Sequence, residues 1–278
     1  MSPVALTGER LDDDHALYGP DLARHRAAYL YAIEKSRASS TVGGCRVLDL
    51  GCGNGYGSAE LADSGARVVA VDRVPPDDQH RRESIRFVRA DLGGVPLAPR
   101  SFGLVVSFQV IEHLEDPRFY LETIADATRD DGLALVTTPN VLMSDGVNPF
   151  HVHEYEAEEL RRVLGTVFDE VEILGVGMSE TAARYQTDRL RRIRRIMRLD
   201  PFGLRNRLPR ALVDWLFARF SILVRRGIQQ GEGLPDLGVA DFPVGPIDEN
   251  AIDLLAVCRH PRMSRGSTSG HASEGVGP

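Results

Sequence analysis

The chain has 278 residues, a formal net charge of −7 and three cysteines. This length fits one large domain or one domain with an insertion, and the proportions of charged and apolar residues are those of a soluble globular protein. The negative charge argues against a nucleic-acid substrate, the cysteines imply neither a disulfide framework nor a site with metal-ligand spacing, and the absence of an apolar run near the N-terminus predicts a cytoplasmic protein.

The first strongly patterned part of the chain combines a helix, a strand and a glycine turn. Residues 22–34 have the pattern of a helix, and residues 47–50 that of a short strand. Glycine then stands at every second position from Gly51 to Gly57, and a helix-compatible segment follows at 58–62. Together these elements present a backbone cradle at a helix N-terminus, where any Cβ would hold a ligand away from the main chain. This run predicts a ligand that contains a nucleoside.

The spacing of the glycines distinguishes between two kinds of nucleoside ligand. The dinucleotide fingerprint G-x-G-x-x-G places its third glycine three residues after the second. Counted from Gly51 that position is Tyr56, and counted from Gly53 it is Ser58. The sequence is instead G-x-G-x-G, with Asp49 two residues before the first glycine. This pattern argues against a nicotinamide dinucleotide.

Further strands follow, and their ends carry polar residues. They are expected at residues 68–72, 85–91, 102–108 and 133–140. Asp72 ends the first of them, where a carboxylate can accept hydrogen bonds from both hydroxyls of a ribose. Asp91 ends the second, and Gln109 opens the polar segment after the third. The crossovers between these strands are short or loop-like at 73–84 and 92–100.

The last part of the chain is expected to add helices, two strands and an insertion. Helices are predicted at 117–129 and 156–164, and strands at 168–176 and 251–258. Residues 178–249 lie between the last two strands and alternate arginines with apolar residues at helical spacing. This insertion can be a lid on the core, a dimerisation element or a helix at a membrane surface. Residues 261–278 are rich in serine and glycine and are expected to be disordered.

The acid before the glycine turn, the acids that end the next strands and the segment 108–114 together resemble the class I S-adenosylmethionine (SAM)-dependent methyltransferases. The resemblance implies an α/β, Rossmann-like fold with a seven-stranded sheet, an antiparallel edge strand and a helical insertion before the last strand, in one domain over residues 1–260. It also implies SAM as the cofactor, with the helix at 22–34 closing over it through Arg24, His25 and Tyr29. The implied cofactor contacts are Asp49, Gly51, Cys52, Gly53, Asn54, Gly55, Tyr56, Asp72, Arg73, Asp91, Leu92 and Gln109.

The candidate catalytic residues are histidines and a neighbouring acid. Methyl transfer from a sulfonium needs the nucleophile to be aligned with the methyl group, and a sugar hydroxyl also needs a base. His151 and His153 alternate in a segment that follows the fifth strand, so on an extended chain both side chains point the same way. Glu112 and His113 follow the fourth strand, and in some relatives such a pair faces the acceptor or a divalent cation. A cation such as Mg²⁺ stays an open alternative, since no dense ligand motif fixes it.

The acceptor is suggested by a narrower resemblance. Segments 7–10, 51–57, 108–114, 148–151 and 248–258 look like those of actinobacterial methyltransferases that act in methylmannose and methylglucose polysaccharide pathways. This implies a sugar O-methyltransferase that caps a 3-O-methylmannoside at its 1-position. The alternatives are an O-methyltransferase of a quinone, phenol or other natural product, and a SAM-binding regulator without activity. The expected partner is an oligosaccharide or small-molecule acceptor and no nucleic acid, while the insertion leaves peripheral membrane contact and a homodimer open.

Overall fold

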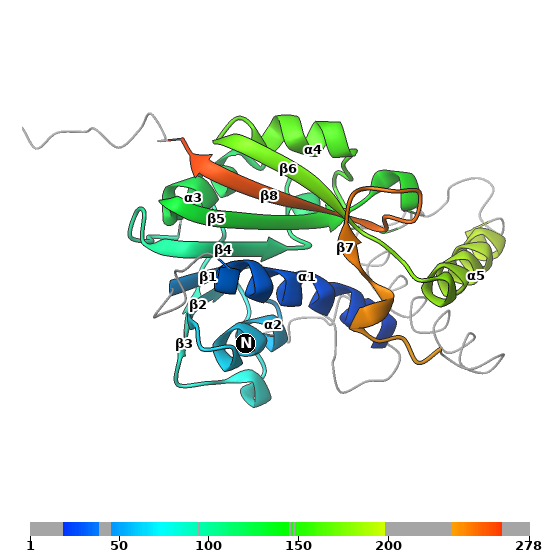
Figure 1. The fold of residues 1–278 in the computed structure, drawn as a ribbon, viewed down its shortest axis with the longest axis horizontal. Coiled ribbons are helices and arrows are strands. Elements are labelled where there is room, and N and C mark those ends of the chain that lie inside the picture. Colours follow the sequence, from blue (N-terminus) through cyan, green and yellow to red (C-terminus); the bar gives the residue numbers. More distant parts are fainter. Residues whose placement is uncertain are drawn as a thin grey trace, which may run out of the picture.

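The fold is built on one mixed sheet of eight strands (Figure 1). It is described from a computed structural model, which places residues 19–38, 46–93, 95–144, 146, 148, 150–197 and 235–262. The strands are β1 (Arg46–Leu50), β2 (Arg67–Asp72), β3 (Ile85–Arg89), β4 (Phe102–Phe108), β5 (Thr128–Pro139), β6 (Phe168–Val176), β7 (Val244–Gly245) and β8 (Asp253–Pro261). Their order across the sheet is β3-β2-β1-β4-β5-β8-β6-β7.

The first five strands are parallel, so their carboxyl ends meet at one edge of the sheet. The chain order reverses between β1 and β4, which is where open α/β sheets bind ligands. β8 runs antiparallel to β5 and to β6, and β7 adds an antiparallel pair at the far edge. The sequence therefore brings the glycine turn after β1 and the polar segment after β4 to neighbouring places on one edge.

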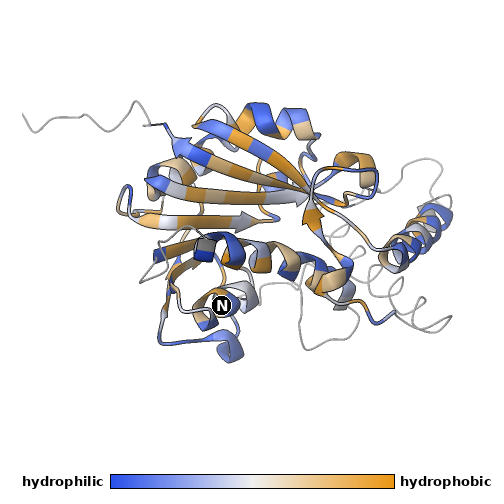
Figure 2. Cartoon of the chain, viewed as in Figure 1, coloured by the Kyte–Doolittle hydropathy of each residue, from blue (hydrophilic) through white to orange (hydrophobic). Residues whose placement is uncertain are grey.

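Helices cover both faces of the sheet. α1 (Gly19–Ala38) and α2 (Tyr56–Asp63) pack on one face, and α3 (Arg118–Ala127) and α4 (Ala157–Leu164) on the other. Val47 joins the apolar cluster on the first face and the next residue, Leu48, joins that on the second. Strands buried on both sides are apolar at consecutive positions, and Figure 2 shows this apolar band along the central strands.

The seven predicted strands are present, and β7 corrects their number to eight. β7 has only two residues, which pair with Gly175 and Val176 of β6, so no alternating pattern marks it in the sequence. β8 continues to Pro261, one residue into the segment expected to be disordered, and residues 263–278 lie outside the described part of the chain. Short 3-10 helices complete the connections: η2 (Asp78–His80), η3 (Ile111–His113), η4 (Val141–Met143) and η6 (Val239–Asp241).

The insertion before the last strand contains α5 (Glu180–Met197), which confirms the helix predicted there. Ala182 of α5 is buried in the same cluster as α1, and Ser179 donates a hydrogen bond to Asp241 of η6 at 2.6 Å. The second helical segment expected in the insertion, at 211–226, lies outside the described residues. Among the helices that the structure places, none is both long enough and apolar enough to cross a bilayer.

α1 packs against α2 through the side chain of Tyr29. The Tyr29 ring is buried and lies edge-on to Phe108, with the ring centroids 4.8 Å apart. A Cβ added to Gly57 in the first turn of α2 would lie only 2.0–2.3 Å from atoms of the Tyr29 ring. The glycine at position 57 is therefore required by the close approach of α1, and not by the conformation of the turn.

Gly57→Ala is expected to destabilise the protein, although alanine in a helix interior is normally favoured over glycine by about 1 kcal/mol. The added methyl group must displace the Tyr29 ring, and overpacking of this kind costs about 1–3 kcal/mol. Urea unfolding measures the difference. Gly238→Ala is the matched control, because no described residue lies within 4 Å of a Cβ at that position and its φ of −105° suits alanine. A Gly57→Ala protein as stable as the wild type would contradict the close packing of α1 against α2 through Tyr29.

Candidate active site

The turn after β1 has a backbone that only glycine adopts without strain. The φ angle is +89° at Gly51, +56° at Gly53 and +92° at Gly55. A Cβ at Gly51 would approach Val110 to 2.5 Å, and one at Gly55 would approach Pro76 to 2.7 Å. Nothing among the described residues lies within 4 Å of a Cβ at Gly53. Gly53 therefore borders open space, as a backbone cradle for a ligand requires.

Asp72 holds this turn from the end of β2. Its carboxylate accepts hydrogen bonds from the backbone N–H groups of Gly53 and Val74, each at 2.9 Å. Each carboxylate oxygen has further lone pairs, so the predicted contact with ribose hydroxyls stays a prediction. The turn ends at Gly55, the N-cap of α2, which provides no side-chain cap for the first N–H groups of the helix. These donors and the helix dipole suit a polar ligand at this edge.

Asp49 lies in the core beneath the turn. Its carboxyl accepts hydrogen bonds from Ser58 of α2 at 2.5 Å and from Tyr29 of α1 at 3.3 Å. Burial raises the pKa of Asp49 to about 7 and outweighs the two hydrogen bonds, which lower it. Asp49 therefore joins β1, α1 and α2 beneath the glycine turn. Its predicted contact with the cofactor stays a prediction.

Three other predicted cofactor residues belong to the turn itself. Cys52 and Asn54 are buried. Tyr56 is the first residue of α2, and its hydroxyl lies 3.2 Å from Nδ1 of His25 on α1. Two of the three α1 side chains proposed from the sequence, Tyr29 and His25, thus contact the residues around the turn, as a helix that covers the cofactor site would.

The ends of β2 and β3 contribute more exposed residues. Arg73 and Asp91 form an exposed ion pair with 3.8 Å between Nε and Oδ1. Leu92 is partly buried, and its Cδ1 lies 3.7 Å from the position of a Cβ at Gly51. These three predicted residues therefore lie along the same edge as the turn, on the side of β3.

Gln109 stands at the end of β4 with a φ of +57°, a left-handed conformation that is uncommon for a residue other than glycine. Its backbone N–H donates to the Thr137 carbonyl at 3.0 Å. Its side-chain Nε2 donates to Thr137 Oγ1 at 3.4 Å. Burial raises the pKa of Asp253, the first residue of β8, while Arg24 and, to a smaller extent, the Gln109 amide lower it. Backbone strain that neighbouring strands maintain on both sides is typical of functional positions.

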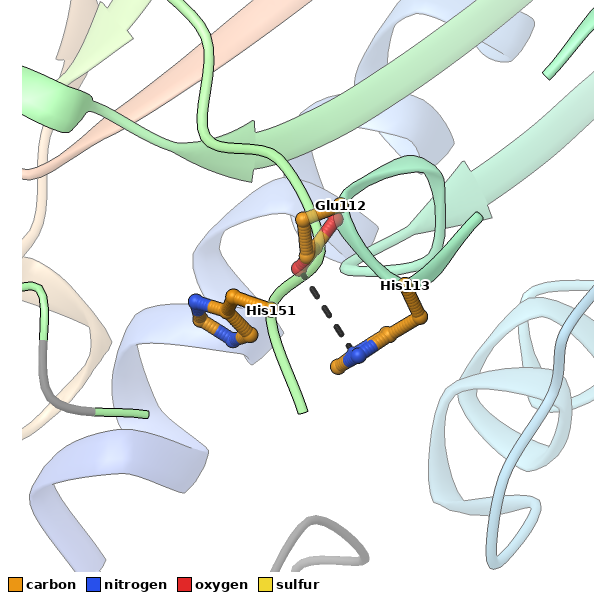
Figure 3. A group of neighbouring side chains, drawn as sticks. All are labelled: Glu112, His113 and His151. Atoms are coloured by element: carbon orange, nitrogen blue, oxygen red, sulfur yellow. Dashed lines mark ion pairs between the residues drawn. The ribbon is translucent and has the colours of Figure 1, made fainter. Parts of the chain in front are cut away.

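Glu112, His113 and His151 come together beside this edge (Figure 3). One ligand atom from each lies within 4.8 Å of the other two. Glu112 is completely buried, its Oε2 accepts a hydrogen bond from Thr138 at 3.2 Å, and its Oε1 accepts none from the described residues. His113 Nε2 lies 4.0 Å from this Oε1. Burial raises the pKa of Glu112 to about 8, so its neutral form is favoured unless a positive charge approaches.

The loop after β5 is fastened to η3 by its main chain. The N–H groups of Val152 and His153 donate to the Glu112 carbonyl at 2.7 and 3.2 Å. His113 Nδ1 lies 3.0 Å from the Phe150 carbonyl, and a carbonyl can only accept. Nδ1 therefore carries a proton, and in the neutral ring the lone pair is on Nε2, which is the nitrogen near Glu112.

His151 and His153 do not share a site, contrary to the expectation from their alternation. His151 Nδ1 lies 2.6 Å from Glu154 Oε1, whereas the exposed His153 places Nε2 2.9 Å from Glu159 Oε1 on α4. The chain is not extended here, because the N–H groups at 152 and 153 converge on one carbonyl. Burial, the largest single effect, raises the pKa of Glu154, but the contacts with His151 and Ser144 together outweigh it, so that the pKa is lowered overall.

Some residues of the site were not identified from the sequence. Thr138 donates to Glu112, Glu154 pairs with His151, and Asp253 accepts from Arg24. Glu154 stands three residues after His151, a spacing that could have identified it. Asp253 opens an apolar strand of the sheet, and an acid at such a position is a signal that sequence analysis can use.

Comparisons with known proteins agree with this geometry. A family model described as "Methyltransferase domain" matches residues 18–196. A "Probable S-adenosylmethionine-dependent methyltransferase" of Mycolicibacterium smegmatis is 36% identical over 199 residues, which cover 66% of this chain and 74% of the relative. A "Ubiquinone biosynthesis O-methyltransferase" of Rhizobium etli is 36% identical over 112 residues, 36% of this chain and 43% of the relative. In fold, a SAM-dependent methyltransferase of Thermotoga maritima has a TM-score of 0.54 at 12% identity, over 91% of this chain and 98% of its own.

The ligand-free protein is expected to lose stability through Asp49 as the pH rises from about 4 to about 7. Asp49 keeps its proton up to a pKa of about 7 in the folded protein and releases it near 4 in an unfolded chain. The folded state then binds more protons, so the free energy of unfolding falls with rising pH. Asp49→Asn removes this titration and should flatten the fall, by an amount on the order of a few kcal/mol.

Denaturant unfolding at several pH values measures this effect. Asp131→Asn, at an exposed aspartate of β5, is the control and should give the wild-type profile. Parallel profiles for Asp49→Asn and the wild type between pH 4 and 7 would show that Asp49 is ionised in the folded protein.

Proposed function

We propose that this chain, which belongs to the class I SAM-dependent methyltransferases, transfers a methyl group from SAM to a hydroxyl group of a sugar or oligosaccharide. SAM is its cofactor, and the glycine turn with open space beside Gly53 fits that cofactor. The observation that carries the choice of a hydroxyl acceptor is the cluster of Glu112, His113 and His151 beside the cofactor edge. A hydroxyl group is a weak nucleophile and gains most from such a cluster.

The proposed base is His151. Its contact with Glu154 keeps the proton on Nδ1 and the lone pair on Nε2. Bound at the glycine turn, SAM would supply an electrophilic methyl group to the acceptor oxygen and would leave as a neutral thioether. The hydroxyl proton moves to Nε2 of His151, and the Glu154 carboxylate stabilises the imidazolium that results. The protein contributes alignment and this proton transfer, while the cofactor supplies the reactive methyl group.

The sugar acceptor is the finer part of the proposal. It rests on the likeness of segments 51–57, 108–114 and 148–151 to methyltransferases of methylmannose polysaccharide pathways, which suggests the 1-hydroxyl of a 3-O-methylmannoside. The R. etli relative, named for ubiquinone biosynthesis, supports a phenol or quinol as the second candidate. A phenol ionises near pH 10 without help, so it depends less on His151 than a sugar hydroxyl does.

The same cluster offers a second role as a cation site. One carboxylate and two imidazoles suit Mn²⁺ or Zn²⁺ better than Mg²⁺, which prefers oxygen ligands throughout. Oε1 of Glu112 accepts no hydrogen bond from the described residues, so it is the atom that would bind the cation, and the cation would have to displace the proton that the raised pKa of Glu112 favours. His151 cannot ligate a cation and accept the proton through the same nitrogen, so the two roles predict different experiments.

The proposed function predicts transfer of label from methyl-labelled SAM to a sugar acceptor. The purified protein is incubated with methylated and unmethylated manno- and gluco-oligosaccharides, a catechol and a quinol. Each acceptor is tested after chelation and again with Mg²⁺, Mn²⁺ or Zn²⁺ added. Label on one oligosaccharide without an added ion supports the base mechanism. Label on only the catechol or quinol overturns the sugar proposal, and activity restored by Mn²⁺ or Zn²⁺ alone assigns the cluster to a cation.

His151→Ala is expected to lower kcat with the labelled acceptor about 10²–10⁴-fold, because a positioned base contributes a factor of this size. SAM affinity should be nearly unchanged. His260→Ala is the matched control, since His260 is exposed and lies near Glu170 at the opposite end of the sheet. His153→Ala should have a much smaller effect, as its ring pairs with Glu159. An unchanged kcat in His151→Ala would remove this residue as the base.

A further inference from the structure

A row of buried charges with alternating sign connects α5 to the cofactor edge. Arg189 of α5 places Nη1 3.1 Å from Oδ1 of Asp21 on α1. The same Oδ1 lies 4.0 Å from Nη2 of Arg24, and Nη1 of Arg24 lies 3.0 Å from Oδ1 of Asp253. The exposed fractions of these side chains are 24% for Arg189, 9% for Asp21, 15% for Arg24 and 3% for Asp253. We refer to these four residues as the charge ladder.

The ladder ends at the cofactor edge, where the carboxyl ends of β4 and β5 lie. Asp253 opens β8 between Pro139 of β5 and Val176 of β6, so its backbone position is fixed on both sides. Gln109 follows β4 and donates to Thr137 of β5 through its backbone N–H at 3.0 Å and through Nε2 at 3.4 Å. A shift at the start of β8 would therefore be transmitted through β5 to Gln109, one of the residues implied as a SAM contact.

Arg24 also reaches the other side of the cofactor site. Its Nη2 lies 3.3 Å from Nε2 of His25, and because arginine only donates, this nitrogen accepts. His25 then carries its proton on Nδ1, 3.2 Å from the hydroxyl of Tyr56 at the start of α2. Arg24 thus connects the start of β8, through Asp253, with the glycine-turn side, through His25.

We propose that Arg24 is a positioning residue for His25 and Tyr56 beside the glycine turn, and that the charge ladder couples the placement of α5 to the affinity for SAM. Paired charges in a buried place interact strongly, and a charge that loses its partner there is costly. If α5 moves, Arg189 loses its ion pair with Asp21. The side chains of Asp21 and Arg24 must then rearrange, because Arg24 is the remaining partner of Asp21 in the ladder. α5, which lies outside the sheet, can in this way influence the cofactor site.

A double-mutant cycle on SAM binding tests the coupling. Calorimetry gives the Kd for SAM of the full chain, of Arg189→Gln, of Asp253→Asn and of the double variant, without any acceptor. Each single variant is expected to weaken SAM binding about tenfold, within the range of allosteric couplings. The double variant is expected to bind no more weakly than Asp253→Asn, because the ladder is already interrupted. Arg189 and Asp253 have no direct contact in the ladder, so purely local structural effects would instead multiply.

Controls separate this result from general damage. Arg259→Gln removes an ion pair of 2.7 Å between Arg259 and Glu170 at the opposite end of β8, and it should leave the Kd unchanged. Arg24→Lys keeps the charge but not the fork that reaches two partners. It should reproduce the loss and replaces Asp253→Asn if that variant does not fold. An unchanged Kd in Arg189→Gln, or multiplicative effects in the double variant, overturns the coupling. Failure of the acceptor experiments would leave this result untouched.

Discussion

The cofactor edge depends on one buried carboxyl group, that of Asp49. It accepts hydrogen bonds from α1 through Tyr29 and from α2 through Ser58, and it stands on β1 directly before the glycine turn. A buried carboxylate without partners would be costly, so the three elements must keep this arrangement together. The Tyr29 ring then leaves no room for a Cβ at Gly57. The Asp49 side chain thereby fixes the positions of the glycine turn, the start of α2 and α1.

The cluster of Glu112, His113 and His151 is brought together by the same sheet topology. β4 and β5 are adjacent and parallel, so the segments that follow them leave the sheet side by side. This brings Glu112 and His113 next to His151, although the histidine is almost forty residues further along the chain. Main-chain hydrogen bonds from 152 and 153 to Glu112 then lock the two segments together. Burial of Glu112 at this point raises its pKa to about 8, so the carboxyl keeps its proton near neutral pH unless a cation or an imidazolium displaces it.

The features that could be predicted from the sequence are those with local causes. The strands, α2 and the turn follow from apolar runs and glycine spacing, and the approach of Glu112 and His151 follows from the order of parallel strands. His153 could not be placed, because two N–H groups that share one distant carbonyl bend the chain and cancel its alternation. β7 is too short to carry a pattern. The pair of Arg24 and Asp253 joins positions 229 residues apart, and a single sequence contains nothing that links them.

The parts of the fold that the sequence predicts differ in role from the parts that it does not predict. The residues proposed to contact the cofactor lie in segments within residues 46–110, and the family match covers them and ends at residue 196. Asp253, η6 and β7 lie beyond that match and reach the same edge from the other side of the sheet. Asp253 forms an ion pair with Arg24 of α1. Asp241 of η6 accepts a hydrogen bond from Ser179, which directly precedes α5, and β7 pairs with the end of β6. A methyltransferase can keep its cofactor chemistry while these later elements change, so we expect the features that select this chain's acceptor to lie among them.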